Sequence, residues 1–215
     1  MPTKSSGIIF ESRRFFGSDP GTIYEDVSRE QATCTPTALD YTELASGLWV
    51  PTFNGSTSKV ATGSDWIGVR AFSASTWIYA ISLGGSNGGR IFDNARTLFF
   101  VTPTNKIALL SDGAGTAATS ATSSISLSTW HHLFVTRTLA GVANFYIDGV
   151  LSGDEDQDSE TPATVGSIVY VGNKADGSRA FDGYIDGLTV LSYIDADSPG
   201  LASNIFATER NLYGV

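Results

Sequence analysis

The chain has 215 residues and a formal net charge of −9 at pH 7, from 13 basic and 22 acidic side chains. A negative surface without a lysine- or arginine-rich stretch repels nucleic-acid phosphates and anionic lipids, so neither is expected as a partner. Charged residues make up only 16% of the chain, and 23 residues are glycine. Such a composition is typical of proteins with many turns and few long surface helices, and it favours an all-β fold.

No targeting or membrane-spanning segment is expected. The start of the chain holds only three consecutive apolar residues, Ile8–Phe10, too few for the core of a signal peptide. No stretch reaches transmembrane length. Cys34 is the single cysteine, so no intrachain disulfide can form, which favours folding in a reducing compartment. We therefore expect a soluble chain that is not addressed to the secretory pathway and does not insert into membranes.

Apolar and polar residues alternate along most of the chain, as they do in half-buried strands. In chain order, this alternation predicts strands at 48–53, 75–82, 97–101, 106–111, 167–172 and 180–191. Glycine-rich, Asn-Gly and Asp-Gly turns separate these runs. Only 199–212 has helical spacing, at Leu201, Ile205 and Leu212, so one short helix is expected there.

A three-stranded meander is predicted over 130–152. Its strongest signal is Asp148-Gly149 between two β-prone runs, because a type I′ hairpin turn needs positive φ at both central residues. The run Trp130–Arg137 would place apolar side chains on both faces of its strand. That pattern is expected inside a sandwich of two sheets.

Four late segments carry a family resemblance: S-T-W-H-H-L-F-V-T-R at 128–137, N-F-Y-I-D-G-V-L at 144–151, I-V-Y-V-G-N at 168–173 and F-D-G-Y-I-D-G-L-T-V-L at 181–191. Weaker segments precede them in the same order, at 24–28, 53–55 and 75–78. Together they resemble the laminin-G-like and pentraxin-type domains of the concanavalin A-like lectin/glucanase superfamily. The resemblance implies an all-β, two-sheet antiparallel jelly-roll β-sandwich with one short C-terminal helix. It also implies a single domain over 1–215, in which 1–45 is the least well matched part and a candidate assembly segment.

Catalysis is not expected. Glucanases that share this fold place carboxylates at alternate positions of one strand as Glu-x-Asp-x-Glu, and no such string occurs here. Asp182 and Asp186 would share a strand face, but the family pattern makes both positions structural. His131 and His132 would point to opposite faces, so they cannot chelate one metal together. No nucleophile-elbow motif is present, and the sequence predicts a domain that is not an enzyme.

Calcium is the candidate cofactor. Asp154, Asp156 and Asp158 alternate along an acidic run, like the first ligands of a calcium loop. Ser159 and Val165 stand where an EF-hand needs glycine and glutamate, so a solvated acidic loop is the alternative.

Two further sites are predicted for ligands. Asp176 is the one residue that matches the pentraxin calcium-loop pattern after Val171-Gly172-Asn173, so it is a candidate ligand-binding residue. Trp66 is flanked by turn residues, and we expect its ring to be exposed and able to stack on a sugar. Trp77 and Trp130 fall at core positions of the family pattern, where burial is expected.

A basic-aromatic patch, Arg13, Arg14, Phe15 and Phe16, is the candidate interface with a partner subunit. It stands out in an acidic chain, and arginine and phenylalanine are enriched at interface cores. The alternative is that Phe15 and Phe16 cover one edge of the domain's own core.

Two function classes remain open, because this fold hosts many functions. The first is a non-catalytic module of a virus or phage particle, such as a capsid decoration protein, a head fibre or a tail-associated adhesin that binds surface glycans. Such a protein is made in the host cytoplasm and needs neither signal peptide nor disulfide. Its expected partners are other virion proteins, a host-surface glycan and further copies of itself. The alternative is a stand-alone or secreted carbohydrate-binding lectin with an extracellular location. A glycosidase is disfavoured because its carboxylate motif is missing.

Overall fold

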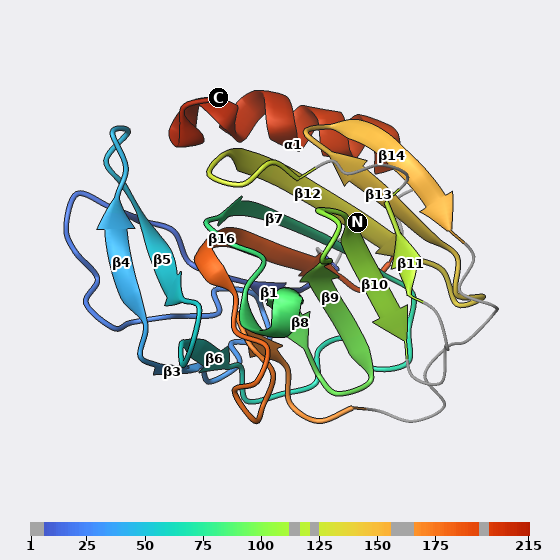
Figure 1. Ribbon diagram of the computed structural model, residues 1–215, viewed down its shortest axis with the longest axis horizontal. Helices are drawn as coiled ribbons and strands as arrows, with labels where there is room; N and C mark the ends of the chain where they lie inside the picture. The colour runs from blue at the N-terminus through green and yellow to red at the C-terminus, as the bar shows by residue number, and fades with distance from the viewer. Residues whose placement is uncertain (1–6, 112–116, 121–124, 156–165, 194–197) are drawn as a thin grey trace, which may run out of the picture.

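The computed structural model describes residues 7–111, 117–120, 125–155, 166–193 and 198–215. Within these residues the strands form a larger and a smaller antiparallel sheet, and one helix lies against the larger sheet (Figure 1). The larger sheet contains β1 (Ile8–Glu11), β2 (Phe15–Phe16), β4 (Asp40–Glu43), β5 (Leu48–Asn54), β7 (Phe72–Ala80), β12 (Trp130–Arg137), β13 (Ala143–Ile147), β14 (Val150–Glu155) and β16 (Asp182–Leu191). The smaller sheet contains β3 (Thr35–Thr37), β6 (Lys59–Ala61), β8 (Arg90–Asp93), β9 (Thr97–Val101), β10 (Ile107–Ser111), β11 (Ala118–Thr119) and β15 (Tyr170–Val171). The helical elements are the 3₁₀ turn η1 (Gly85–Asn87) and the helix α1 (Ser198–Tyr213).

Strands that are distant in sequence are neighbours in both sheets. The larger sheet has the order β14-β13-β12-β7-β16-β5-β2, with β1 also paired to β16 and β4 to β5. The smaller sheet has the order β11-β10-β9-β8-β15-β6-β3. The N-terminal β1 and the late β16 thus lie side by side, with Ile8 opposite Leu191. The predicted all-β, two-sheet antiparallel jelly roll with a short C-terminal helix is confirmed.

The predicted strands are present, with ends that differ by up to three residues from the expected ranges. The strand Thr97–Val101 agrees residue for residue, whereas 167–172 contracts to Tyr170–Val171. The sequence pattern does not reveal β1 to β4, β6, β8 and β11, which have two to four residues each. Strands this short carry too few residues for an alternation to show, and pairing with longer neighbours defines them.

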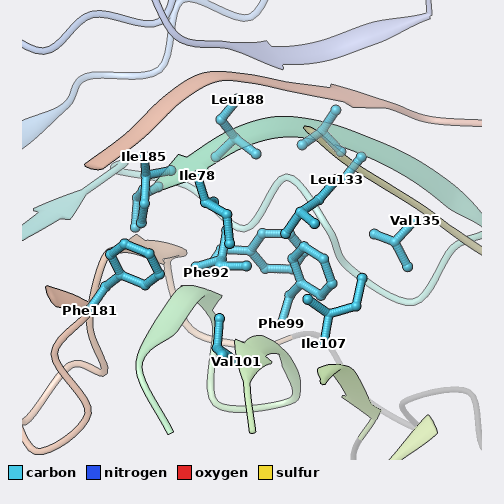
Figure 2. Close-up of a cluster of buried hydrophobic side chains, with 14 of the residues drawn as sticks. Ile78, Phe92, Phe99, Val101, Ile107, Leu133, Val135, Phe181, Ile185 and Leu188 are labelled. Carbon is cyan, nitrogen blue, oxygen red and sulfur yellow. The ribbon is translucent and has the colours of Figure 1, made fainter. Parts of the chain in front are cut away.

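The main core lies between the two sheets. Phe92, Phe99 and Ile107 from the smaller sheet meet side chains such as Ile78 and Leu133 from the larger one, all at most 1% exposed (Figure 2). Burial of each such side chain stabilises the fold by about 1.5–3 kcal/mol.

Helix α1 covers the outer face of the larger sheet, which is the face turned away from the smaller sheet. Trp77 on this face stacks on Tyr213 of the helix, with ring centroids 4.3 Å apart. Phe134 and Ala202 belong to a second contact between the sheet and the helix. Because both faces of the sheet are covered, all eight residues of β12 are buried. Trp130, the first of them, is therefore buried as expected.

The predicted hairpin at Asp148-Gly149 is confirmed. Asp148 has φ 52° and Gly149 has φ 78°, and Ile147 pairs with Val150 across the two-residue turn. The carboxylate of Asp148 accepts a hydrogen bond from the backbone N–H of His132 at 2.9 Å. A Cβ at Gly149 would lie 3.0 Å from the Cα of Ser203, so this glycine also lets α1 approach the turn.

One core cluster unites Phe10 near the start of the chain with Val190 near its end. This shared cluster supports the predicted single domain, and its extent over 1–215 stays a prediction. No helix in the described part of the chain is long and apolar enough to cross a membrane.

Replacing Asp148 by Ala together with Gly149 by Val should lower the free energy of unfolding by about 1–3 kcal/mol. Positive φ is unfavourable for β-branched residues, and the valine side chain would also be too close to α1. Urea denaturation followed by tryptophan fluorescence measures the loss. An unchanged unfolding midpoint would contradict the assigned turn.

Candidate functional site

A pocket of about 570 Å³ opens on the outer face of the larger sheet, between the N-terminal segment and α1. We call it the outer pocket. Its floor is made by side chains of β7, β12 and β16, and its two walls come from residues 11–14 with Val27 and from α1. The lining residues are Glu11, Ser12, Arg13, Arg14, Val27, Ser73, Ser75, Phe134, Gly187, Thr189, Leu191, Leu201, Ile205 and Glu209.

The N-terminal wall is a short two-stranded ladder, which we call the ridge and which consists of residues 11–13 and 25–27. The backbone N–H of Arg13 donates to the carbonyl of Glu25 at 3.0 Å, and that of Val27 donates to the carbonyl of Glu11 at 2.8 Å. Ser12 pairs with Asp26 between them. Because side chains alternate along such a ladder, the exposed Arg13, Glu25 and Val27 lie on one side, while Ser12 and Asp26 are buried on the other.

Asp26 holds the ridge and the loop that follows it. One carboxylate oxygen accepts hydrogen bonds from the backbone N–H groups of Glu11 and Ser28, at 3.0 and 2.9 Å. The other accepts from the N–H of Ala32 at 2.9 Å. This early Asp-x-Ser turn, part of the family resemblance, therefore fixes one wall of the outer pocket.

The opposite wall is tied to the ridge by a cluster that we call the α1 clasp: Arg14, Trp77, Asp186, Glu209 and Tyr213. Arg14 donates two hydrogen bonds to the carboxylate of Glu209, at 2.9 and 2.6 Å. Glu209 also accepts from the indole N–H of Trp77 at 2.8 Å. The hydroxyl of Tyr213 donates to Asp186 at 2.6 Å, and Arg14 Nε lies 3.4 Å from the same carboxylate oxygen.

The clasp shifts the pKa values of its two carboxyl groups in opposite directions. Burial raises the pKa of Asp186, and the nearby Arg14 charge only partly offsets this rise. Burial acts in the same direction on Glu209, but the hydrogen bonds and charge of Arg14 outweigh it and lower the pKa of Glu209. Glu209 is therefore held ionised against Arg14 and is unsuited to act as a general acid.

A serine and a histidine meet beneath the pocket floor. Ser75 Oγ lies 2.8 Å from Nε2 of His132, and burial lowers the pKa of His132 to about 4, so the ring is neutral at pH 7. A serine nucleophile also needs an acid that orients the histidine and N–H donors for an oxyanion. In the described part of the chain Nδ1 of His132 has no hydrogen-bond partner, and Ser75 is paired on both sides within the sheet. The pair thus supplies a fixed hydroxyl group rather than a nucleophile.

The two histidines point to opposite faces of β12, as expected. His131 Nδ1 lies 2.8 Å from the Asp148 carboxylate, and its Nε2 accepts from the backbone N–H of Ser126. Of the residues described, no group of three His, Cys, Asp or Glu side chains is arranged to hold a metal ion.

The four residues of the predicted interface patch have different environments. Arg14 belongs to the α1 clasp, and Phe15 packs against the core and against the ring of Tyr41, 5.8 Å away. Phe16 is 55% exposed, and Arg13 is exposed and paired with Glu25. Arg14 and Phe15 thus have partners within the domain. The alternative interpretation, in which Phe15 and Phe16 cover an edge of the core, agrees with the position of Phe15 but not with the exposed Phe16. A role of Arg13 and Phe16 in contact with a partner subunit stays a prediction.

The expectation that Trp66 is exposed is wrong. Its side chain is 5% exposed, and its ring stacks on Phe10 with centroids 4.8 Å apart. The indole N–H donates to Thr62 Oγ1 at 2.9 Å. Gly63 and Ser64 of the preceding turn are exposed, but Phe10 of β1 covers the ring, so Trp66 offers no face for a sugar.

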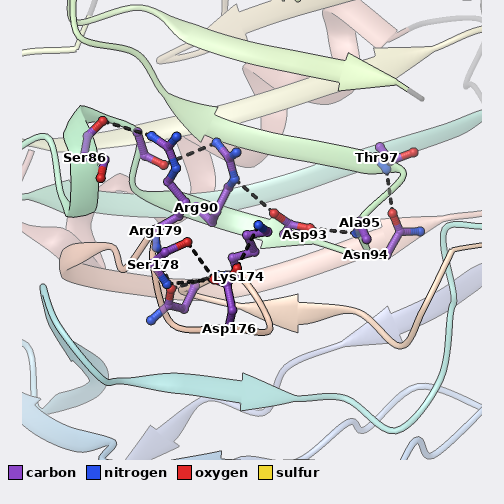
Figure 3. A network of polar contacts seen from close by, with 12 residues as sticks. Ser86, Arg90, Asp93, Asn94, Ala95, Thr97, Lys174, Asp176, Ser178 and Arg179 are labelled. Carbon is purple, nitrogen blue, oxygen red and sulfur yellow. Dashed lines mark hydrogen bonds and ion pairs between the residues drawn. The ribbon is translucent and has the colours of Figure 1, made fainter. Parts of the chain in front are cut away.

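Asp176 lies at an exposed turn, where its own neighbours satisfy its carboxylate (Figure 3). Lys174 Nζ lies 2.8 Å away, and Ser178 donates from its backbone N–H and its hydroxyl. The hydrogen bond from Lys174, followed by those from Ser178, lowers the pKa of Asp176. Asp176 does not line the outer pocket, and its part in ligand binding stays a prediction.

The predicted calcium site is only partly described. Asp154 is the last but one residue of β14 and lies opposite Asn144, while Asp156 and Asp158 lie outside the described residues. Calcium binding therefore stays a prediction. Of the carboxylate pair on β16, Asp186 is 2% exposed beneath Tyr213, which agrees with a structural role.

Sequence reasoning missed most residues of the outer pocket. The helical spacing did indicate Leu201 and Ile205 on one face of the C-terminal helix, and Glu209 lies four residues further along that face. No sequence pattern pointed to Ser75 and Thr189. Serine and threonine are common on strands, and these two residues come together only because their strands pair.

Replacing Arg14 by Leu should lower the free energy of unfolding by about 2–4 kcal/mol, because the buried carboxyl group of Asp186 and the partly buried carboxylate of Glu209 lose the neighbouring cation. The matched control is Arg13→Leu, whose ion pair with Glu25 is exposed and whose loss should cost at most about 1 kcal/mol. Chemical denaturation of both variants measures the difference. Equal losses would show that the clasp does not hold α1.

Comparison with known proteins supports the fold. No curated protein matches this sequence. Among solved structures, the binding domain of Paraclostridial Mosquitocidal Protein 1 superposes with a TM-score of 0.68 at 13% identity, over 96% of this chain and 55% of that one. The botulinum neurotoxin serotype G binding domain gives 0.66 at 16%, over 94% and 51%. This chain therefore spans about half the length of these two toxin domains.

A third similar structure matches nearly end to end. It is Domain 4 of AbnA, a GH43 extracellular arabinanase from Geobacillus stearothermophilus, in complex with arabinotriose. Its TM-score is 0.63 at 15% identity, over 91% of this chain and 98% of that one. The family model Laminin_G_3, described as the concanavalin A-like lectin/glucanases superfamily, matches residues 54–194. With its two facing antiparallel sheets and this match over most of its length, the chain belongs to the concanavalin A-like lectin/glucanase superfamily.

Proposed function

We propose that this domain is a non-catalytic binding module that holds a unit of a surface glycan in the outer pocket. The observation that carries the proposal is the pocket's lining: hydroxyl groups on the floor face apolar side chains on the helix wall. A sugar has both hydroxyl groups and apolar C–H faces, and ligand pockets of about 300–1,000 Å³ bind through such mixtures.

The charges at the pocket support a neutral ligand. Arg14 and Glu209 neutralise each other, and Arg13 is paired with Glu25. Glu11 adds a carboxylate that can accept hydrogen bonds from sugar hydroxyls. A ligand with several hydroxyl groups and no net charge fits this surface without leaving a buried charge unpaired.

A glycosidase is the less favoured function. Glu209 is held ionised by Arg14, so it cannot donate a proton to a leaving group. A hydrolase of this kind needs one carboxyl group that stays protonated and a second that is free to act on the sugar.

The first prediction for this function uses a glycan array that includes arabinotriose. The protein should bind at least one oligosaccharide and should release no reducing sugar from it. Ile205→Trp, which fills the pocket from α1, should weaken binding at least about tenfold by occluding the site. The matched control is Ala207→Trp, at an exposed position of the same helix, which should bind normally. A folded protein that binds no glycan would contradict the proposal, as would release of reducing sugar.

We further propose that the domain belongs to a virus or phage particle, where it acts as a capsid decoration protein, head fibre or tail-associated adhesin. The cysteine content supports folding in a reducing cytoplasm. Cys34 is the single cysteine of the chain, so it cannot form an intrachain disulfide, as is usual for proteins of reducing compartments. A secreted lectin is the alternative setting.

Mass spectrometry of purified particles from the source should detect this chain in stoichiometric amounts together with structural proteins. Recovery of the chain only from culture medium freed of particles would favour the secreted lectin.

A further inference from the structure

A second hollow lies on the other side of the ridge, and we call it the side pocket. Its volume is about 500 Å³, and Arg13 and Val27 line both it and the outer pocket. The two hollows are therefore neighbours with one shared wall. The side pocket is lined by Arg13, Tyr24, Glu25, Asp26, Val27, Gln31, Ala32, Thr33 and Cys34.

The shared wall is open to solvent. Val27 is 40% exposed, and the side chains of Arg13 and Glu25 are 51% and 45% exposed. These residues lie on one side of the ridge, so they form a continuous surface between the two pockets. An ion pair as exposed as Arg13–Glu25 contributes little stability, so Arg13 can move aside for a ligand at small cost.

The floor beneath this wall is rigid. Asp26 binds three backbone N–H groups, including that of Ala32 in the side pocket. Both pockets are thus preformed, so the protein loses little conformational entropy when a ligand binds in them.

We propose that the outer pocket and the side pocket form one track for a linear oligosaccharide, which crosses the ridge over Arg13 and Val27. The inference rests on the proposed glycan-binding function and specifies its ligand as a chain of several sugar units rather than a single sugar. Each pocket lies within the range of volumes of small-ligand sites, and the side pocket offers polar groups such as Glu25, Gln31 and Thr33 to hydroxyls.

An extended peptide fits this surface less well. A peptide that adds to a strand needs free backbone groups at the edge. On the ridge the N–H groups of Glu11, Ser12 and Arg13 all donate within the domain, to Asp26, Leu188 and Glu25 respectively. Recognition here must therefore come from side chains and from the shapes of the two pockets.

The test compares ligands of increasing length. Isothermal titration would use arabinose, arabinotriose and arabinohexaose, with parallel xylose- and glucose-based series. The affinity should rise at least about tenfold from the monosaccharide to the longer members of one series, because the second pocket adds contacts to the same molecule.

The side-pocket variant is Gln31→Gly with Thr33→Val. Gln31 has φ 46°, which glycine adopts freely, so the backbone is preserved while the polar side chains are lost. This variant should keep the monosaccharide affinity and lose the gain with length. Thr35→Val, an exposed threonine that does not line the side pocket, is the matched control and should keep both.

The outcomes separate the two proposals. If affinity does not rise with length, or if the side-pocket variant retains the rise, the track is wrong. The proposed function then survives provided that Ile205→Trp weakens binding at least about tenfold, as predicted above. If no sugar of any length binds, both proposals are wrong. Binding of an extended peptide library in place of sugars would overturn the ligand class.

Discussion

The burial of Trp77 on the outer face of the larger sheet is the contact on which the rest of the structure depends. Its ring is fully buried, and its indole N–H must find an acceptor once water is excluded. Glu209 of α1 supplies that acceptor, but a partly buried carboxylate in turn needs a cation. Arg14 provides it and so brings the N-terminal segment across the sheet to the helix. If the indole N–H of Trp77 or the carboxylate of Glu209 lacked its partner, the free energy of unfolding would fall by about 1–3 kcal/mol.

The outer pocket follows from this arrangement. The clasp holds the ridge and α1 at a fixed separation, while the sheet between them carries small residues such as Ser73, Ser75 and Gly187. Space therefore remains above the floor. The walls are rigid because one is fixed by Asp26 and the other by the stacking of Tyr213 on Trp77. A preformed pocket of this kind favours binding, since little freedom is lost when a ligand enters.

Local patterns predicted the features that depend on neighbouring residues. The Asp148-Gly149 hairpin and the two buried faces of β12 were predictable, because turn chemistry and period-two alternation act over a few residues. Trp66 shows where such reasoning stops. Its local sequence has turn residues, but its exposure is decided by Phe10 on a strand that local pattern did not reveal.

The basic-aromatic segment stands out in the sequence, but the partners of Arg14 and Phe15 within the domain could not be predicted from it. Arg14 meets Glu209 and Asp186 because β1 joins the sheet beside β16 and α1 returns over it, and no spacing in the sequence encodes that meeting. The floor hydroxyls were missed for the same reason, since they come from separate strands. The similar solved structures, at 13–16% identity, share this fold, and the ligand must be argued from the residues that line the pockets.

The proposed glycan site lies on the outer face of the larger sheet, between the ridge and α1. The most direct measurement is an NMR map of amide chemical-shift changes as an oligosaccharide selected on the array is added. The account predicts the largest changes at the outer pocket, in residues such as Thr189, Leu201 and Ile205. Changes concentrated on the smaller sheet, around β8 to β10, with an unperturbed α1 would contradict it.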